Sequence, residues 1–559
     1  MRSMRCIKYV FILCLLCMPL NVFGALNAYL GVTGLIKNDP GAYQGYTLFS
    51  PLMGKQTYLI DMQGRVVHKW AIETQFALHA ILMENGNLLR AVTPNGLKKP
   101  EGEPLFEDYG RDRIEDYHVA LKQYRSTLEY QAYLSKGGRF DHGGAGGVIQ
   151  EVDWEGNVVW EFTYSNGEHR QHHDFTPMPN GNILFIAWEY KTAAECLEAG
   201  RKAYLCGTDE DHRHPFLEEG VHVDTIVEVN RKGEVVWKWS FWDHLTSGMM
   251  SWFSPGKLDV NWHTKGFKGL PAKGYYDPDW NHINSIDYNA ELDQIVIASR
   301  EMGEFYVIDH STVDYVNPEA GIKKAAGSAG DFVYRWGNPS VRFGDSILFK
   351  RIAPTYESNR LQQLFGAHDV QWIDPGLPGE GHFLIFDNGW ARPFANFSRV
   401  LQVNPYDEEG AYVPQLNLER EDKGHGWEPV HGIISNQVVW KYNAQSFGLG
   451  LNSLHLSSAQ RLPNGNTLIT AGSQGYLLEV GFEGDNSLIN TMKPKSQQKP
   501  TVQVYWEFVN PVTLEGRVDV LTDGNPITGL NPVFSARRYA ADFAGLKGKV
   551  LQPLEEGFQ

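Results

Sequence analysis

Short apolar stretches, cut by turn residues, run along the whole chain, and one pattern of apolar and polar positions returns six times. Each copy is a β-branched or aromatic run with a charged residue near its end, and most copies follow a Gly, Asn or Asp turn. Such segments are typical of short, twisted strands. The six copies are VVHKW (66–70), VVWEF (158–162), VVWKW (235–239), FVYRW (332–336), VVWKY (438–442) and VYWEF (504–508).

Further strands accompany these copies. A second strand such as TIVEV or YLLEV precedes most of them, and a pair of strands around a turn follows five of them. Four strands in each of six units predict an all-β, six-bladed β-propeller. The sixth unit is complete only if VFSARRYA (533–540) supplies its inner strand while TYLID and VVHKW supply outer ones. Pairing of N- and C-terminal strands would therefore close the ring.

The repeat spacing is uneven, which indicates long inserted loops. They are expected at 92–145, 189–222 and 243–280, where propeller loops shape a binding face. We expect one propeller domain over residues 25–559.

Residues 1–24 have the layout of a secretory signal peptide, because three basic residues precede an apolar run that ends at small residues. No later segment is apolar enough to span a bilayer. The mature protein is therefore expected to be periplasmic or otherwise exported, without a membrane partner once the signal is cleaved.

Charge and cysteine content narrow the picture further. The net charge of −16 becomes −19 without Arg2, Arg5 and Lys8, and no basic run remains, so nucleic acid is an improbable partner. Two of the five cysteines, Cys196 and Cys206, lie beyond the signal. In an exported protein we expect them to pair as a disulfide, the alternative being two buried free thiols. The oligomeric state is not predicted.

Histidines recur at the start of the predicted inner strands. His79, His173, His282 and His368 share this register, so their side chains would converge on the central channel. In the two remaining units Ser457 or Ser458 and Arg537 or Arg538 fall near the corresponding place. His172 would point to the opposite side of its strand from His173, which favours a structural role, although strand register alone decides between the two.

The second strand of each blade returns to the channel mouth, because it is antiparallel to the first. Arg300 would therefore lie beside His282, and Asn284 would share the side of the strand that His282 occupies. Asn388 would lie in the same way beside His368, and Trp390 follows it as a candidate substrate contact. These residues, with His79, are the predicted substrate-binding groups.

Several imidazoles around one axis suit either a metal or acid/base chemistry, and the arginine favours the second. A guanidinium beside neutral imidazoles makes a cradle for sulfate or phosphate oxygens, whereas a cation beside a metal is costly. We therefore expect no metal and no cofactor. The remaining outer-strand and loop histidines are assigned structural roles, namely His68, His222, His244, His263, His310 and His382. Trp160, Trp237 and Trp440 are expected to pack blades together.

Three stretches give the sequence a recognisable likeness: WNHINSIDYNAELDQIVIASR (280–300), FGAHDVQWI (365–373) and LPNGNTLITAG (462–472). In these the chain resembles the bacterial arylsulfotransferase family, exported arylsulfate sulfotransferases that use no nucleotide sulfate donor. The most specific part is a His-x-Asn-Ser strand with an Arg eighteen residues after the His, matched by His282, Asn284, Ser285 and Arg300.

The resemblance implies a ping-pong transfer of a sulfuryl group from a phenolic sulfate ester to a phenol. It implies that His368 is transiently sulfated and that His173, His282 and Arg300 support it. Two alternatives stay open at this stage. One is a propeller hydrolase or lyase with a divalent metal on His173, His282 and His368; the other is a propeller without enzymatic activity that serves as a binding platform.

Overall fold

The computed structural model describes residues 33–52, 54–71, 76–104, 108, 114–208, 219–247, 254–262, 278–339, 341, 362–392, 397–418, 432–434, 437–443, 451–484, 493–513 and 531–558. The predicted signal peptide (1–24) and His263 lie outside these residues. The chain divides into two compact units: the first comprises residues 1–69, 373–403 and 438–559, and the second residues 70–372 and 404–437. The single domain predicted over residues 25–559 remains a prediction.

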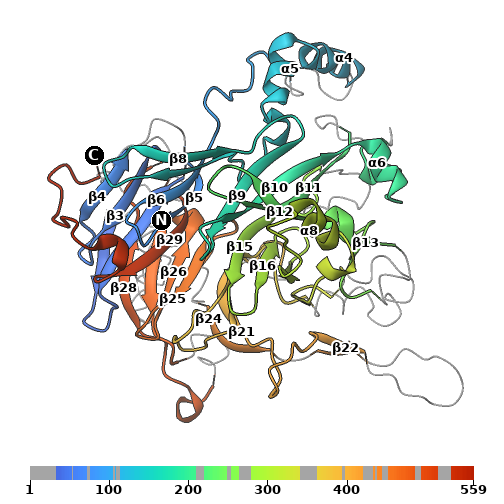
Figure 1. The fold of residues 1–559 in the computed structure, drawn as a ribbon. Helices are drawn as coiled ribbons and strands as arrows, with labels where there is room; N and C mark the ends of the chain where they lie inside the picture. Colours follow the sequence, from blue (N-terminus) through green and yellow to red (C-terminus); the bar gives the residue numbers. More distant parts are fainter. Residues whose placement is uncertain are drawn as a thin grey trace, which may run out of the picture. The chain divides into compact units, whose positions relative to one another are not determined.

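The second unit contains three complete four-stranded antiparallel sheets, in which consecutive strands are neighbours (Figure 1). The first sheet consists of β5 (Phe76–Leu82), β6 (Leu88–Val92), β7 (Val148–Val152) and β8 (Val158–Thr163). The second consists of β9 (His169–Pro177), β10 (Ile183–Lys191), β11 (Val221–Val229) and β12 (Val235–Ser240). The third consists of β15 (Ile283–Asn289), β16 (Gln294–Ser299), β17 (Glu304–Asp309) and β18 (Tyr334–Trp336).

The next sheet is divided by the boundary between the units, and its inner strand β19 (His368–Trp372) belongs to the second unit. Its other strands, β20 (Phe383–Asp387), β21 (Arg399–Val403) and β24 (Val438–Tyr442), belong to the first. The fifth sheet consists of β25 (Ser458–Arg461), β26 (Thr467–Ala471), β27 (Tyr476–Val480) and β28 (Val504–Val509), and it gains an edge strand, β1 (Gly34–Asn38), that the sequence pattern did not predict.

The sixth sheet joins the two ends of the chain. The C-terminal strand β29 (Val533–Ala540) pairs antiparallel with β2 (Gly45–Pro51), and β3 (Gln56–Ile60) and β4 (Val66–Ala71) follow in order. The predicted completion of the last blade by N- and C-terminal strands is therefore correct. Six antiparallel sheets of this kind are the blades of a six-bladed β-propeller, so the predicted fold class is confirmed.

The remaining elements lie in the connections between strands. They are the helices α4 (Ile114–Arg125), α5 (Leu128–Ser135), α6 (Ala193–Glu198) and α8 (Pro318–Ala325), the parallel pair β13 (Leu245–Thr246) and β14 (Leu258–Asp259), and the hairpin β22 (Leu416–Leu418) and β23 (Gly432–Ile434). Short 3-10 turns are η3 (Gly138–Phe140), η4 (Ala203–Leu205), η6 (Phe241–His244), η7 (Ser328–Gly330), η8 (Gly472–Gln474), η9 (Lys495–Gln497) and η10 (Ala544–Leu546). Among the described helices, none is both long and apolar enough for a transmembrane span.

Buried acidic residues on third strands link neighbouring blades. Glu228 of β11 accepts a hydrogen bond from Asn182 in the turn of its own blade (2.6 Å) and lies 2.9 Å from His310 of the next blade. Glu151 of β7 is bound in the same way by Asn87 at 2.5 Å and by Arg231. The Asn-Gly-Asn turns therefore do more than reverse the chain, because each one also holds a carboxylate for the adjoining blade.

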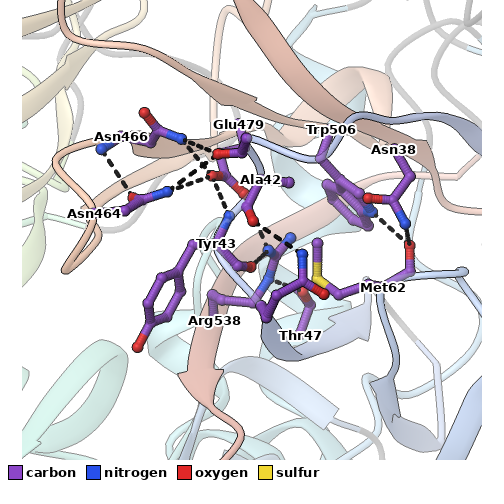
Figure 2. Close-up of polar contacts among 12 residues, drawn as sticks. Asn38, Ala42, Tyr43, Thr47, Met62, Asn464, Asn466, Glu479, Trp506 and Arg538 are labelled. Atoms are coloured by element: carbon purple, nitrogen blue, oxygen red, sulfur yellow. Dashed lines mark hydrogen bonds and ion pairs between the residues drawn. The ribbon is translucent and has the colours of Figure 1, made fainter.

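The same arrangement in the first unit ties the C-terminal strand to the fifth sheet (Figure 2). Glu479 of β27 accepts hydrogen bonds from Asn466 and from the backbone of Tyr43, both at 2.7 Å, and pairs with Arg538 at 3.1 Å. Arg538 also donates to Thr47 at 2.6 Å, and its guanidinium lies over the ring of Trp506 at 4.6 Å. Arg538, one of the positions expected near the channel, thus has a structural role.

The tryptophans of the recurring strands pack blades as predicted. Trp160 donates its indole N–H to the backbone carbonyl of Arg231, and Trp440 donates to Phe482, at 2.9 and 2.8 Å. Trp237 donates to the Thr312 hydroxyl at 2.8 Å. In each case a buried or half-buried indole N–H of one blade is satisfied by an acceptor in the next blade.

Candidate active site

Four inner strands of the second unit lie side by side and bring the predicted histidines together. Their strand starts are held by hydrogen bonds from backbone N–H groups to side chains of the adjoining strand: Ile286 to Asp174 (3.0 Å), Val370 to Ser285 (3.0 Å) and Trp372 to Asp287 (2.9 Å). Strands β9, β15 and β19 are thereby locked in register, so the side chains at the start of each strand face a common region.

His173 stands at a bulge in β9. The pairing of β9 with β10 shifts between Phe185 and Ile186, and His173 has a φ of 48°, in the left-handed region that a residue with a Cβ rarely adopts. The bulge turns the imidazole of His173 toward His282, whose ring centre lies 4.7 Å away. Strain of this kind at a buried histidine is typical of a functional position.

His172 points elsewhere. Its ring stacks on Trp188 of the neighbouring strand, with the ring centres 3.8 Å apart, and its Nε2 lies 2.9 Å from Asp224 of β11. The two adjacent imidazoles share one proton between their Nδ1 atoms, which are 2.8 Å apart. His172 therefore packs within its own blade and orients His173, as the alternation of strand side chains suggests.

A glycine-rich segment supports His173 from behind. The Gly144 carbonyl accepts the backbone N–H of His173 at 2.8 Å, and Gly144 itself has a φ of 92°. A Cβ on this residue would lie only 2.1 Å from the imidazole of His173. Only glycine fits here, so the HGGAGG stretch that begins at His142 helps to build the site.

His282 also has a left-handed backbone, with a φ of 46°, and it pairs with a carboxylate. Its Nδ1 lies 2.5 Å from Oδ2 of Asp279, while Oδ1 of Asp279 accepts the indole N–H of Trp188 at 2.9 Å. Burial opposes protonation of His282, but the charge and hydrogen bond of Asp279 outweigh it and raise its pKa above the usual value. His282 is therefore the imidazole of the cluster best able to hold a proton.

His173 has the opposite electrostatic setting. Burial lowers its pKa well below the usual value, and positive charge on His282, His172, His368 and Arg300 lowers it further. His173 is thus neutral at physiological pH. His282, His368 and Arg300 all lie within electrostatic range of His173, so the cluster combines a neutral imidazole with groups that can carry positive charge.

His368 begins β19 and is buried, with 2% of its surface exposed. Its Nδ1 lies 3.2 Å from the carbonyl oxygen of Gly366, and a carbonyl can only accept, so Nδ1 carries the proton and the lone pair lies on Nε2. In that tautomer Nε2 is the nitrogen that can act as a nucleophile.

Asn284 connects the His282 strand to His368. It is fully buried, and its amide N–H donates to the carbonyl of Ala367 at 2.8 Å, directly before His368. Its Oδ1 has no partner among the described residues. The predicted contact of Asn284 with substrate stays a prediction, and the structure adds that Asn284 fixes the start of β19.

Arg300 follows β16 as predicted and lies at the mouth beside His282, whose carbonyl accepts its backbone N–H at 3.1 Å. Its guanidinium is partly exposed and pairs with Glu301. His79 lies 3.6 Å from Asp174 of β9 and is buried.

Asn388 and Trp390 belong to the first unit. Asn388 donates to the carbonyls of Ser453 and Leu456, at 2.6 and 2.9 Å. Trp390 is a half-buried turn residue. Their predicted role in substrate binding stays a prediction.

Three features of the site were missed at the sequence level. Asp279 lies in the segment before β15, and Gly144 lies in the inserted loop. The third feature is a hydrogen-bonded pair of imidazoles, in which Nε2 of His142 lies 2.6 Å from Nδ1 of His222. Both rings interact electrostatically with Asp279. Among the other histidines, His310 and His244 pair with acidic residues and pack on tryptophans, in structural roles. In the described part of the chain, no group of three or more His, Cys, Asp or Glu side chains could hold a metal ion.

The predicted Cys196–Cys206 disulfide is wrong for this structure, in which both residues are buried free thiols. A hydrogen bond between the two side chains raises the pKa of Cys196, with burial adding to it, and lowers that of Cys206, toward which Arg201 also contributes. The prediction depended on the expected export of the protein to an oxidising compartment. Closeness of two cysteines in the sequence does not by itself form a disulfide, because the two thiols must also be oxidised.

Comparison with known proteins finds similarity in the part of the chain that contains the candidate site. The family model Arylsulfotransferase (ASST) matches residues 138–404. An arylsulfate sulfotransferase from Escherichia coli O6:H1 is 25% identical over 55% of this chain and 49% of its own length. One from Lelliottia amnigena is 22% identical over 51% of this chain and 46% of its own.

The chain therefore spans about half the length of the curated relatives it matches. A solved protein of unknown function from Bacteroides caccae is 11% identical, and the match covers 89% of this chain and 98% of that protein with a TM-score of 0.35. The matched segment contains His173, His282, Arg300 and His368, so the residues of the candidate site lie in the part of the chain that is similar to the arylsulfotransferase family.

Proposed function

We propose that this protein is an arylsulfate sulfotransferase that moves a sulfuryl group from a phenolic sulfate ester to a phenol, with no nucleotide sulfate donor. The observation that carries the proposal is the cluster of His173, His282 and His368 with Arg300, all within the family match, in which His173 and His368 are buried. Such a cluster combines a nucleophile, a proton donor and a fixed cation, which are the three groups that sulfuryl transfer needs.

His368 acts as the nucleophile. Its Nε2 lone pair attacks the sulfur of the donor, the bond from sulfur to the aryl oxygen breaks, and an N-sulfo-histidine forms. The aryl oxygen leaves with the bonding electron pair. One difficult displacement is thereby divided into two easier ones.

His282 moves the proton. In the first half of the cycle its Nε2–H protonates the departing phenolate oxygen, and in the second half the neutral ring removes the proton of the acceptor phenol as that oxygen attacks sulfur. The bond from sulfur to Nε2 of His368 breaks in this second transfer and its electron pair returns to Nε2, which restores both the protonated His282 and the neutral His368. A ping-pong cycle therefore needs no net proton exchange with water.

Arg300 holds the non-bridging sulfuryl oxygens. Its guanidinium is permanently charged and offers several N–H groups in one plane, which suits a tetrahedral oxyanion. We also propose that the protein is exported, because residues 1–24 have the layout of a signal peptide.

The test uses 4-nitrophenyl sulfate with and without added phenol. We expect release of 4-nitrophenol to rise with phenol, phenyl sulfate to appear, and the peptide that contains His368 to gain the mass of one sulfuryl group in the absence of acceptor. His368→Asn should abolish all three, whereas His310→Asn, which changes a buried structural histidine of the same unit, should keep them.

Three results would contradict the proposal. Release that does not depend on phenol and gives inorganic sulfate would indicate a sulfatase. A stoichiometric metal needed for activity would favour the hydrolase or lyase alternative. Activity unchanged in both His368→Asn and Arg300→Ala would favour a binding platform.

A further inference from the structure

Asp279 is a buried carboxylate whose two oxygens are both directed by the surrounding side chains. Oδ2 lies 2.5 Å from Nδ1 of His282, and Oδ1 accepts the indole N–H of Trp188 at 2.9 Å. Only 7% of the surface of Asp279 is exposed. A carboxylate held at both oxygens cannot rotate without losing a hydrogen bond, so it is a rigid reference for the imidazole that it contacts.

The charge on Asp279 is maintained despite its burial. Burial by itself favours the neutral acid, but positive charge on His282, the hydrogen bond from that ring, and charge on His142 and His172 hold the pKa of Asp279 well below its usual range. The carboxylate is therefore ionised whenever the enzyme is at neutral pH, and it places one negative charge among several imidazoles.

This negative charge gives His282 a pKa shift opposite to that of the neighbouring histidines. His172, His173 and His222 have pKa values lowered well below the usual value, chiefly by burial. His282 is buried as well, yet its pKa is raised. Arg300 also acts on His282 and opposes its protonation, and Glu301 favours protonation to a smaller degree than Asp279 does.

The hydrogen bond also decides which nitrogen reacts. An ionised carboxylate only accepts, so Nδ1 of His282 must carry a hydrogen in both protonation states of the ring. Proton exchange with a substrate can then take place only at Nε2. The ring centre of His282 lies 4.7 Å from that of His173, within the cluster that contains His368.

We propose that Asp279, oriented by Trp188, is a positioning residue for the sulfuryl transfer proposed above: it fixes the tautomer of His282 and keeps the proton on Nε2 that the leaving phenol receives. This inference rests on the proposed function. Asp279 does not touch the substrate in this scheme, and it acts only through His282.

The test exploits the leaving group. A 4-nitrophenolate leaves readily without protonation, whereas unsubstituted phenolate needs an acid. We expect Asp279→Asn to lower kcat/KM for phenyl sulfate by about 100-fold or more, and for 4-nitrophenyl sulfate by about tenfold or less. The alkaline limb of the pH profile for phenyl sulfate should move to lower pH, because protonated His282 has lost its counter-charge.

Matched variants separate positioning from general damage. Asp293→Asn removes the carboxylate that lies 2.7 Å from Nδ1 of His310, a pair of the same type in the same unit, and it should leave the ratio of the two donors unchanged. Trp188→Phe removes the bond to Oδ1 of Asp279 while keeping an aromatic ring beside His172, and it should change the ratio in the same direction by a smaller factor. It also serves as the test if Asp279→Asn fails to fold.

Equal losses on both donors in Asp279→Asn and Trp188→Phe, with an unmoved pH profile, would overturn the inference and leave Asp279 with a structural role only. Failure of the proposed function would look different, because the wild-type protein would then transfer sulfuryl groups from neither donor to phenol. The two failures are therefore distinguishable in one set of assays.

Discussion

Two buried polar clusters, one in each unit, differ in how their charges are satisfied. Around Arg538 and Glu479 in the first unit, the carboxylate accepts three hydrogen bonds besides its ion pair with Arg538, and neither residue has a left-handed backbone. Around His282 in the second unit, the backbone of His173 and His282 is left-handed, and the fully buried Asn281 has neither amide atom bonded to any described residue.

The difference indicates that the cluster around Arg538 has a structural role and that the cluster around His282 has a functional one. A buried charge that is paired and hydrogen-bonded holds blades together at little net gain, and its loss is costly only because a partner is left unpaired. Strained backbone and unsatisfied polar atoms lower stability, so they persist where function requires them. The histidine cluster carries both costs. The Arg538 cluster has no left-handed residue at Arg538 or Glu479, although Nη2 of Arg538 has no hydrogen-bond partner among the described residues.

The largest expected effect on stability is at Glu479. Glu479→Ala leaves the guanidinium of Arg538 buried without its carboxylate, and we expect the free energy of unfolding to fall by about 3–5 kcal/mol. Glu479→Gln keeps an acceptor for Asn466 and should cost less. Urea denaturation followed by tryptophan fluorescence measures both. A loss under 1 kcal/mol in Glu479→Ala would show that the ion pair between Glu479 and Arg538 does not stabilise the fold, which would contradict its assignment as a structural cluster.

Gly144→Ala should affect the histidine cluster with a smaller loss of stability. The new Cβ meets the imidazole of His173, and φ is unfavourable, so we expect a loss of about 1–3 kcal/mol and a fall in transfer rate because His173 is displaced. Gly143→Ala is the matched control, since a Cβ there meets nothing within 4 Å. Equal behaviour of the two variants in stability and transfer assays would contradict a role for Gly144 as support of His173.

The free energy of unfolding should also depend on pH through the histidine cluster, with a smaller effect than the two substitutions above. His172, His173 and His222 have lowered pKa values in the folded protein, so below about pH 6.5 the unfolded chain binds more protons and stability falls as pH falls, by up to about 1.4 kcal/mol per unit for each ring. His282 acts in the opposite direction: its raised pKa adds stability below about pH 6.5 that is lost as pH rises through its folded pKa.

The measurement is the free energy of unfolding between pH 5 and 7.5. His222→Gln removes one of the rings with a lowered pKa and should flatten the slope below about pH 6.5. His310→Asn removes a ring with a raised pKa, so it should leave that slope unchanged and remove the loss of stability that His310 contributes as pH rises above about 6.5. An unchanged slope in His222→Gln would show that its burial does not suppress protonation.

Sequence alone predicts the strands and the register of the histidines, because both depend on local alternation. The six recurring strands and their partners form where the pattern places them, and His173, His282 and His368 fall in equivalent positions. Pairing partners are harder to predict. Asp279 precedes its strand and Gly144 belongs to a long inserted loop, so tertiary folding alone brings them to the imidazoles. The left-handed backbone at His173 and His282 leaves no trace in the alternation either.

The smallest expected effect concerns Cys196 and Cys206, where the predicted disulfide and the observed thiols give different outcomes. A disulfide closing so short a loop would add about 3 kcal/mol, and reductant would remove it. With free thiols, reductant leaves the unfolding midpoint unchanged, and Cys206→Ala costs about 1 kcal/mol through lost packing. In protein that lacks residues 1–24, unfolded without reductant, a thiol reagent should titrate two groups per chain. Titration of none would restore the disulfide and place a covalent link in the loop between β10 and β11.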